Sequence, residues 1–411
     1  MRDLAKVVAM LCRGAISSRG ARAVLAAVRL GFCLALAACL AAETAPAEPQ
    51  EPVRLVARDP AGHGLLCESQ GKTVLLVAGT PEEMGRAHGA LLQQKVRRLM
   101  ERAVYLVGAG DTLQSGTWYF DRMAEIERRT LPNTPERFLR ECDALSAAAG
   151  VSKRDGRYGN LLPERFHCSG VAVRGKASAG GRVIHARVLD YMRDFNLQQC
   201  ALVAVFMPQG RNAWITLSYA GFVGTVTAMN DQGLAVGEMG GGGDGQWDGM
   251  PMSYLLRDLM ERASSVEEAL DILRRTPRTC EYYYVLSDRS KNLAAVRATA
   301  AELTVLGPGE QHPELPLVPE DTVLISGPGR AKALSQRLQQ WYGQITVPGM
   351  MQIIRRPVAM ESNLHDAIFT PETLDLWAAD AGKHTVACDE RYAHFNLEAL
   401  MGYYQRVMGE K

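Results

Sequence analysis

Short runs of β-type residues, separated by turn signals, occupy the middle of the chain and constrain its fold more than any other feature. The turn signals include Ala179-Gly-Gly181, Pro208-Gln-Gly210 and Asn230-Asp-Gln-Gly233, residue types that reverse the chain. The runs predict six strands, at residues 170–174, 183–189, 201–207, 213–219, 225–229 and 234–238. Because turns this short join antiparallel neighbours, we expect a meander of mostly antiparallel strands.

Helices and further strands alternate in blocks on either side of this meander. Thr80 can cap a helix that begins at Pro81, Glu83 completes a capping box, and the apolar spacing continues through about Tyr105. We expect later helices at 252–262, 266–275, 331–341 and 350–355. We expect later strands at 282–287, 293–299, 303–306, 322–325, 364–369 and 374–379. These blocks predict an α+β fold of two packed sheets with helices on the outer faces.

The first 39 residues have the pattern of an export signal. Arginines between positions 19 and 29 precede an apolar run at 30–39 that is too short for a comfortable membrane span. The run ends in Leu36-Ala37-Ala38-Cys39, which resembles the bacterial lipobox and implies lipidation of Cys39. The alternative is an ordinary signal cleaved near Ala42 and a secreted protein. We expect a lipoprotein of the periplasm or outer membrane, attached to the membrane through its lipid alone, with 40–52 as a Pro/Ala/Glu-rich tether.

Charge balance and cysteine spacing exclude several function classes. The chain has 46 lysines and arginines against 45 acidic residues, without long runs of either sign, so we expect no nucleic-acid partner. Apart from Cys168 and the cysteines of the leader, the chain has five cysteines: Cys67, Cys142, Cys200, Cys280 and Cys388. They are too sparse for a disulfide framework, and an odd number cannot all pair within one chain. The sequence has no CxxC or HExxH spacing, so we expect neither a metal site nor a cofactor.

Cys168 stands directly before the first strand of the meander, and two charged residues close the second strand. That strand returns after the 179–181 turn and ends with Arg187 and Asp190. In a hairpin the end of the second strand lies beside the start of the first, so both side chains can reach Cys168. Singly, such a cysteine is more often a small buried apolar residue. Together the three residues predict a nucleophilic site.

This arrangement resembles the cysteine branch of the N-terminal-nucleophile hydrolases, the group of isopenicillin-N acyltransferase, choloylglycine hydrolase and acid ceramidase. Segments 79–89, 228–236 and 363–372 are similar to the acyltransferase-like subgroup, and the resemblance spans about residues 74–400. It implies a four-layer αββα sandwich and a precursor that cuts itself between His167 and Cys168. A helical propeptide-derived chain, 53–167, and a catalytic chain, 168–411, would remain associated as a heterodimer.

The chemistry of such an enzyme gives each residue a role. A cysteine thiol has a pKa near 8.5, whereas a terminal α-amine, near 7.7–8.0, can act as base once the preceding bond is cut. Arg187 can favour the thiolate of Cys168, Asp190 can hold the terminal ammonium, and the Asn230 amide can donate to a developing oxyanion. The plain alternatives are a surface ion pair for Arg187 and Asp190 and a turn residue for Asn230.

Two features depart from the family pattern. The family's second asparagine, on a strand well downstream, is replaced by Ser326, a shorter donor that we regard as a possible oxyanion substitute. An arginine of the family's C-terminal third is also unplaced, with Arg355 and Arg356 as neighbours of its expected position. Of the histidines in this region, we expect His167 and His185 to be structural.

These observations predict an enzyme that hydrolyses linear amide bonds of small substrates through an acyl-enzyme on Cys168. Acyl transfer to an amine acceptor would use the same intermediate and is the first alternative. A papain-like hydrolase, with His365 or His394 as base, is less suitable because a strand rather than a helix follows Cys168. A catalytically silent binding lipoprotein of the same fold is the alternative outside enzymology, favoured by Ser326.

Overall fold

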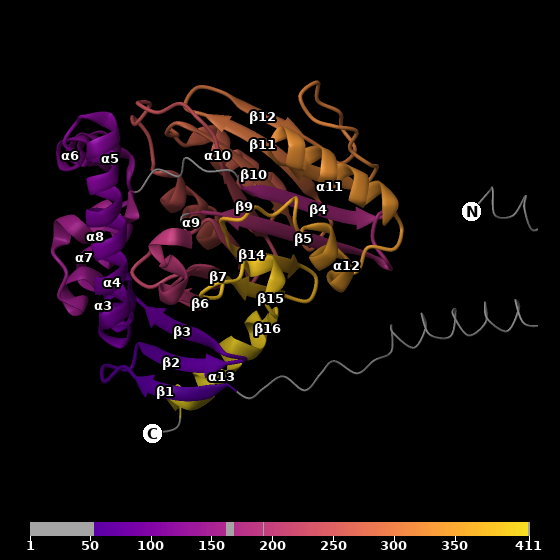
Figure 1. Ribbon diagram of the computed structural model, residues 1–411. Coiled ribbons are helices and arrows are strands. Elements are labelled where there is room, and N and C mark those ends of the chain that lie inside the picture. The colour runs from indigo at the N-terminus through magenta and orange to yellow at the C-terminus, as the bar shows by residue number, and fades with distance from the viewer. Residues whose placement is uncertain (1–52, 162–167, 192, 410–411) are drawn as a thin grey trace, which may run out of the picture. The chain divides into compact units, whose positions relative to one another are not determined.

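The computed structural model describes residues 53–161, 168–191 and 193–409 (Figure 1). Two sheets form its centre. The larger has ten strands in the order β1-β2-β3-β6-β7-β8-β9-β10-β11-β12, and the smaller has six in the order β13-β4-β5-β14-β15-β16. All neighbouring strands of both sheets run antiparallel except β3 and β6, which are parallel.

The elements have the following bounds. The strands of the larger sheet are β1 (Arg54–Arg58), β2 (Gly64–Ser69), β3 (Lys72–Gly79), β6 (Ala201–Pro208), β7 (Trp214–Tyr219), β8 (Thr227–Asn230), β9 (Ala235–Gly240), β10 (Glu281–Ser287), β11 (Leu293–Thr299) and β12 (Leu303–Leu306). Those of the smaller sheet are β4 (Ser169–Gly175), β5 (Gly181–Asp190), β13 (Thr322–Ile325), β14 (Asn363–Thr370), β15 (Asp375–Asp380) and β16 (Ala393–Asn396). The α-helices are α3 (Pro81–Leu91), α4 (Gln93–Met100), α5 (Val107–Ser115), α6 (Tyr119–Thr130), α7 (Glu136–Ala149), α8 (Lys153–Asn160), α9 (Met252–Arg262), α10 (Val266–Arg275), α11 (Pro328–Gln340), α12 (Val347–Ile353) and α13 (Leu397–Gly409).

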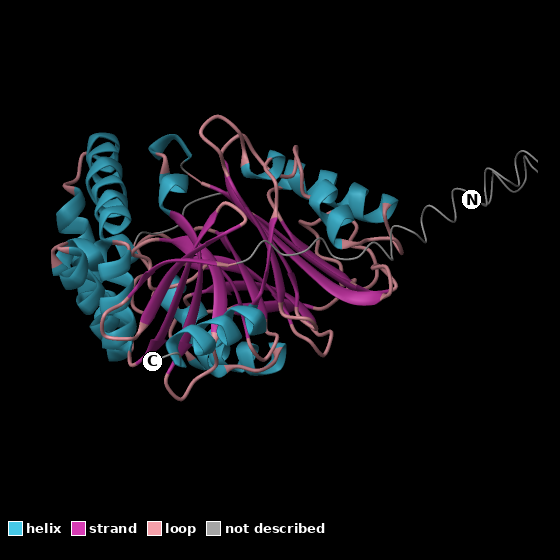
Figure 2. Ribbon diagram, turned by 90° about the horizontal axis from the view of Figure 1, so that it is seen from below, coloured by secondary structure: helices cyan, strands magenta, loops and turns pink. Residues whose placement is uncertain are grey.

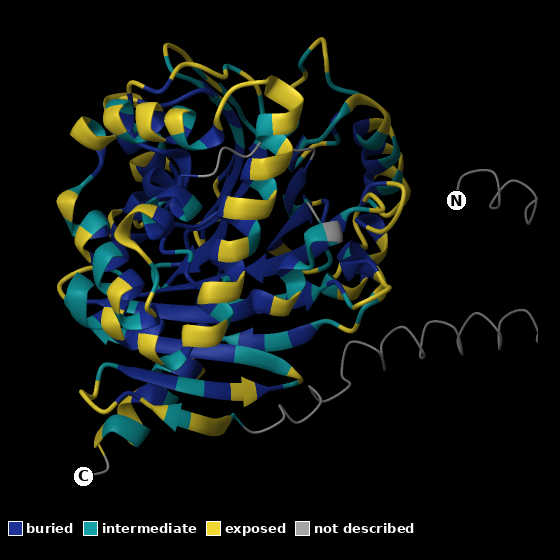
Figure 3. Cartoon of the chain, turned by 60° about the vertical axis from the view of Figure 1, so that its left-hand side comes forward, coloured by how far each residue is buried: buried dark blue, intermediate teal, exposed yellow. Residues whose placement is uncertain are grey.

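The two sheets pack face to face, and helices cover their outer faces (Figure 2). Side chains of β6 and β7, such as Val205 and Ile215, share one apolar cluster with Ala367 and Phe369 of β14. On the other side of the smaller sheet, Val173 of β4 packs with Leu334 of α11. Figure 3 shows the strands largely buried and the helices with exposed outer faces. The α+β sandwich predicted from the block order is therefore confirmed.

The expected helix after Thr80 is present. The segment 53–79 before it, which was expected to be part of a helical chain, forms strands instead. Thr80 Oγ1 accepts from the Glu83 backbone N–H at 3.4 Å, and Glu83 Oε2 accepts from the Thr80 N–H at 2.7 Å. Strands β1 to β3 precede this helix and extend the larger sheet. The apolar run of β3 is buried at four consecutive positions, so it has no period-2 alternation to identify it as a strand. The last strand and helix, β16 and α13, were also not predicted.

Helix α3 crosses α7 at very close range. A Cβ on Gly85 would lie 2.3 Å from the Glu141 carbonyl oxygen, and one on Gly89 would lie 2.3 Å from that of Leu145. Both glycines lie within the 79–89 segment that resembles the family. Their missing side chains let the two backbones touch.

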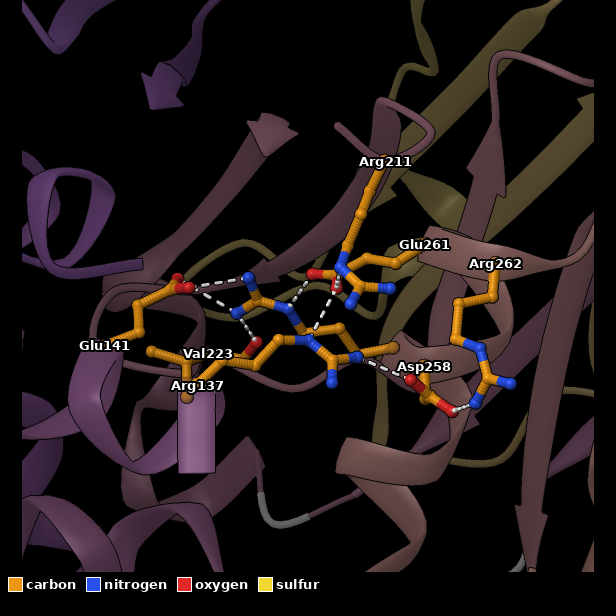
Figure 4. Close-up of polar contacts among 8 residues, drawn as sticks. Arg137, Glu141, Arg211, Val223, Asp258, Glu261 and Arg262 are labelled. Atoms are coloured by element: carbon orange, nitrogen blue, oxygen red, sulfur yellow. Dashed lines mark hydrogen bonds and ion pairs between the residues drawn. The ribbon is translucent and has the colours of Figure 1, made fainter. Parts of the chain in front are cut away.

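A buried ionic network joins α7 to α9 (Figure 4). Arg257 of α9 donates to both carboxylate oxygens of Glu141 on α7, at 2.9 and 2.6 Å, and to Glu261 at 2.8 Å. Arg137 of α7 in turn contacts Glu261 and Asp258 of α9. The segment before residue 162 is thus joined to the segment after 167 both by these charges and by the β3–β6 ladder. Within the described residues, no helix is long and apolar enough to cross a membrane.

Candidate active site

Cys168 lies at the start of β4, inside the sandwich, with 4% of its surface exposed. Strand β4 lies between β13 and β5, and the register pairs Gly170 with Arg187. A Cβ on Gly170 would lie 2.7 Å from the sulfur of Met239. The glycine therefore lets the two sheets approach each other directly beside the cysteine.

Arg187 reaches Cys168 from the neighbouring strand, as the hairpin predicted. Its Nη2 donates to the cysteine Sγ at 3.5 Å and to Glu238 Oε2 at 3.3 Å, and its Nε donates to the Glu238 carbonyl at 3.0 Å. The guanidinium is completely buried. A full positive charge in such a place favours the anionic form of a neighbouring thiol.

Asp190, at the end of the same strand, binds an arginine that the sequence reasoning missed. Arg330, in the first turn of α11, donates from Nη1 to Asp190 Oδ2 at 2.6 Å and from Nη2 to the Cys168 carbonyl at 3.1 Å. The Met360 N–H donates to Asp190 Oδ1 at 2.9 Å. Burial raises the pKa of Asp190 to about 6, against the opposing effect of the Met360 N–H and of Arg330.

The unplaced arginine was sought beside Arg355 and Arg356, but the arginine of the C-terminal third that contacts Cys168 is Arg330. Arg355 pairs with Asp389, and Arg356 pairs with Glu361, and both arginines are largely exposed. Arg330 follows Ser326 by four residues, so the β13–α11 turn brings both to Cys168. Proximity to Ser326 was the signal that could have identified it.

Ser326 also lies at the site. Its hydroxyl is 2.6 Å from that of Ser169, the residue after Cys168. Ser326, Arg330 and Cys168 line a cavity of about 630 Å³ whose other walls are mostly apolar. Its apolar lining residues include Met239, Tyr283, Val296, Leu306, Leu315, Ile325 and Pro328, and its polar ones include Arg297, His312 and Glu314.

The structure gives Asn230 a different task from the one expected. Its Nδ2 donates to the carbonyls of Met260 and Ala263 at the end of α9, at 2.9 and 2.7 Å. Its Oδ1 accepts from the backbone N–H groups of Gln232 and Leu234 within the turn. Both amide protons are therefore used to hold a helix end, and the expected donation to an oxyanion does not fit this position.

His365 belongs to the site through Arg187 rather than through Cys168. Its Nε2 lies 3.0 Å from Arg187 Nη1. The Arg187 guanidinium therefore occupies the position beside the sulfur that the base of a papain-like hydrolase would need. His394, the other candidate, stacks on Trp377 and pairs with Asp375. His185 hydrogen-bonds Ser287 of β10, and burial lowers its pKa to about 3.

Several expectations concern other parts of the chain. Cys39, the tether and His167, hence one side of the expected cleavage site, lie outside the described residues. In the described ranges, no three His, Cys, Asp or Glu side chains are grouped closely enough to hold a metal ion.

Comparison with known proteins agrees with this geometry. Residues 181–307, which begin at β5 and end after β12, match the family described as acyl-coenzyme A:6-aminopenicillanic acid acyl-transferase. The match agrees with the resemblance to the acyltransferase-like group of N-terminal-nucleophile hydrolases. The matched region contains Arg187, Asp190 and Glu238.

Two curated proteins illustrate what this chain is similar to. Protein dcd1B of Dictyostelium discoideum is 25% identical over 337 residues, which cover 74% of this chain and 67% of the relative. The N-acylethanolamine-hydrolyzing acid amidase of Mus musculus is 23% identical over 183 residues, covering 42% of this chain and 50% of that protein.

Solved structures similar to this chain include the Caenorhabditis elegans ortholog of the same amidase, with 16% identity, a TM-score of 0.41 and coverage of 50% of this chain and 93% of that one. A mutant of the conjugated bile acid hydrolase from Clostridium perfringens matches with 12% identity, a TM-score of 0.38 and coverage of 56% and 93%.

Proposed function

We propose that this protein hydrolyses linear amides of small acyl substrates, with Cys168 as its nucleophile. The observation that carries the proposal is the position of Cys168 Sγ, 3.5 Å from a buried guanidinium and at the wall of a largely apolar cavity of about 630 Å³. Such a cavity can take the acyl part of a substrate, while the cysteine meets its carbonyl carbon. The name of the amidase relative is consistent with this substrate class.

The precursor would first cut itself between His167 and Cys168. The freed α-amine of Cys168 then serves as base for its own thiol, because its ordinary pKa of about 7.7–8.0 leaves part of it neutral at pH 7. Asp190 lies at the same end of the hairpin and supplies a carboxylate for the ammonium form. Arg330 donates to that carboxylate and to the Cys168 carbonyl, which holds the two groups in position relative to each other.

In the reaction, the sulfur adds to the amide carbon and the amine proton passes to the leaving nitrogen, which departs as an amine. Water then attacks the thioester, releases the acid and restores the thiol. An amine acceptor in place of water would make the second step an acyl transfer. With Asn230 engaged elsewhere, the Ser326 hydroxyl is the side-chain donor beside Cys168 that can stabilise the developing oxyanion.

For its location we retain the export hypothesis, with Cys39 as a lipidated first residue and the segment before β1 as the tether. Stable membrane anchoring takes more than one acyl chain. If Cys39 carries such an anchor, the wild-type protein should partition with membranes. Cys39→Ala should be released into the soluble fraction. A wild-type protein found entirely in that fraction would refute the anchor.

N-terminal sequencing tests the self-cleavage. We expect a second chain that begins Cys-Ser-Gly-Val in the wild type and an uncut precursor in Cys168→Ala. The two chains should copurify, since β3 pairs with β6 and Arg257 with Glu141 across the break. A single chain with full amidase activity would refute the proposal, and a single chain without activity would favour the silent binding protein.

A further inference from the structure

A buried histidine on the strand next to β5 holds Arg187 in place. The side chain of His365 on β14 has no exposed surface. Its Nε2 lies 3.0 Å from Arg187 Nη1 and 3.2 Å from Thr227 Oγ1, and its Nδ1 lies 3.0 Å from the Tyr219 hydroxyl. Tyr219 and Thr227 belong to β7 and β8, so the ring bridges the two sheets at the arginine.

These partners determine the protonation of the ring. A guanidinium carries N–H donors and no acceptor, so Nε2 must present its lone pair to Arg187. The single ring proton is then on Nδ1 and is donated to the Tyr219 hydroxyl. Burial first, and the charge of Arg187 second, hold the pKa of His365 well below its usual value. The ring is therefore neutral when the enzyme works.

We propose that His365 is a positioning residue, a neutral acceptor that turns Arg187 toward Cys168 without neutralising its charge. This inference rests on the proposed role of Cys168 as nucleophile. The Glu238 carbonyl anchors Nε of Arg187, and His365 anchors Nη1. Because the guanidinium is planar, these two anchors fix its rotation and leave Nη2 facing the sulfur at 3.5 Å.

The neutrality of His365 matters because of the charges already present. Arg187 contacts the sulfur and pairs with Glu238 of β9, and Arg330 of α11 contacts the Cys168 carbonyl and pairs with Asp190 of β5. These two cations and two anions balance. A further carboxylate at position 365 would leave a net negative charge around the thiol, and a like charge at this range raises an acid's pKa by about 1–3 units.

The matched pair His365→Gln and His365→Glu separates positioning from neutralisation, because the two side chains differ in charge and hardly in size. The rate at which iodoacetamide alkylates Cys168, measured by mass spectrometry at a series of pH values, reports the pKa of its thiol. We expect His365→Gln to stay within about threefold of the wild type and His365→Glu to slow alkylation at pH 7 by about tenfold or more. With an N-acyl amide substrate the loss should appear in kcat and leave KM unchanged.

His185→Gln is the control, because His185 is an equally buried histidine on β5 that hydrogen-bonds Ser287 instead. It should leave the alkylation profile unchanged even if it lowers the melting temperature. If His365→Glu cuts itself more slowly than His365→Gln does, the half-times of self-cleavage report the same loss of thiolate.

Identical alkylation profiles for His365→Gln and His365→Glu would overturn the proposal. Losses in all three variants that simply follow their melting temperatures would overturn it as well. A Cys168→Ala protein that keeps its amidase activity would refute the nucleophile itself, which is a separate failure from that of His365.

Discussion

Two buried arginines of this protein, Arg257 and Arg187, differ in the partners that surround their guanidinium groups. Arg257 meets Glu141 in a bidentate pair and Glu261 in a second contact, and it packs against the rings of Phe138, Phe206 and Trp214. Arg187 meets one carboxylate oxygen at 3.3 Å, a neutral histidine and a cysteine sulfur.

The difference indicates what each charge does. Two carboxylates at 2.6–2.9 Å satisfy the charge of Arg257, so that arginine serves to join α7 to α9. The charge of Arg187 is shared between a longer carboxylate contact and the thiol, so part of it is available to stabilise a thiolate. Variants of the two arginines should therefore fail in different ways.

The largest expected effect is on stability, in Arg257→Gln. This change leaves Glu141 buried without its bidentate cation, although Glu261 keeps Arg137, and removing one partner of a buried ion pair costs about 3–5 kcal/mol. Urea denaturation should show that loss, while the folded fraction keeps its kcat/KM. An Arg257→Gln protein with unchanged stability would mean that the network in Figure 4 contributes little.

Arg187→Gln should show the converse pattern. Without the adjacent cation the thiol pKa rises, and an increase of about two units reduces the thiolate at neutral pH about a hundredfold. We expect kcat/KM and the rate of self-cleavage to fall by about that factor, whereas Arg257→Gln keeps its kcat/KM. Equal stability losses with retained activity would remove the distinction between the two arginines.

The carboxylate at the site should make stability depend on pH. Burial raises the pKa of Asp190 to about 6, above its unfolded value near 3.9. Its contribution to stability is therefore complete below about pH 4 and is lost as the pH rises through about 6. In the uncut Cys168→Ala protein we expect the free energy of unfolding to decline over this window.

Adding Asp190→Asn to that protein should remove roughly 2 kcal/mol of the decline. Asp366, whose pKa burial raises to about 7, should account for a remaining decline at somewhat higher pH. Unfolding curves at pH 4, 6 and 8 measure both contributions. A decline of the same size with and without Asp190→Asn would show that Asp190 does not titrate in this range.

The smallest effect should come from Ser326→Ala. The hydroxyl is a single neutral donor beside Cys168, so its loss should lower kcat by about tenfold. KM should be unaffected if the hydrogen bond forms with the oxyanion alone. An unchanged kcat would exclude Ser326 as the oxyanion donor.

The local parts of this architecture could be predicted from the sequence. The hairpin from Cys168 to Asp190 depends on a turn signal and on alternation, and the helix after Thr80 depends on a capping box. Strand β3 was missed because its central residues are buried on both faces and because, although β2 is adjacent in sequence, its other partner, β6, lies more than a hundred residues away. No local pattern contains such a pairing.

The same contrast between local patterns and long-range contacts applies to the residues of the site. Arg187 reaches Cys168 through a hairpin, and was found. Arg330, just after β13, contacts Cys168, and His365 on β14 contacts Arg187; the places of both strands in the sheet follow from tertiary packing alone. Asn230 lies in the expected turn, but α9 packs against that turn and takes both amide protons. Its role depended on a neighbour that the sequence could not place.

The mass of the larger chain, measured after brief mixing with an N-acyl amide and quenching in acid, tests the central claim most directly. The account predicts a chain that starts at Cys168 and carries one added acyl group, which hydroxylamine removes as expected for a thioester. Arg187→Gln should accumulate the same species about a hundred times more slowly. An uncut chain that turns over substrate, or an acyl group on a residue other than Cys168, would contradict the account.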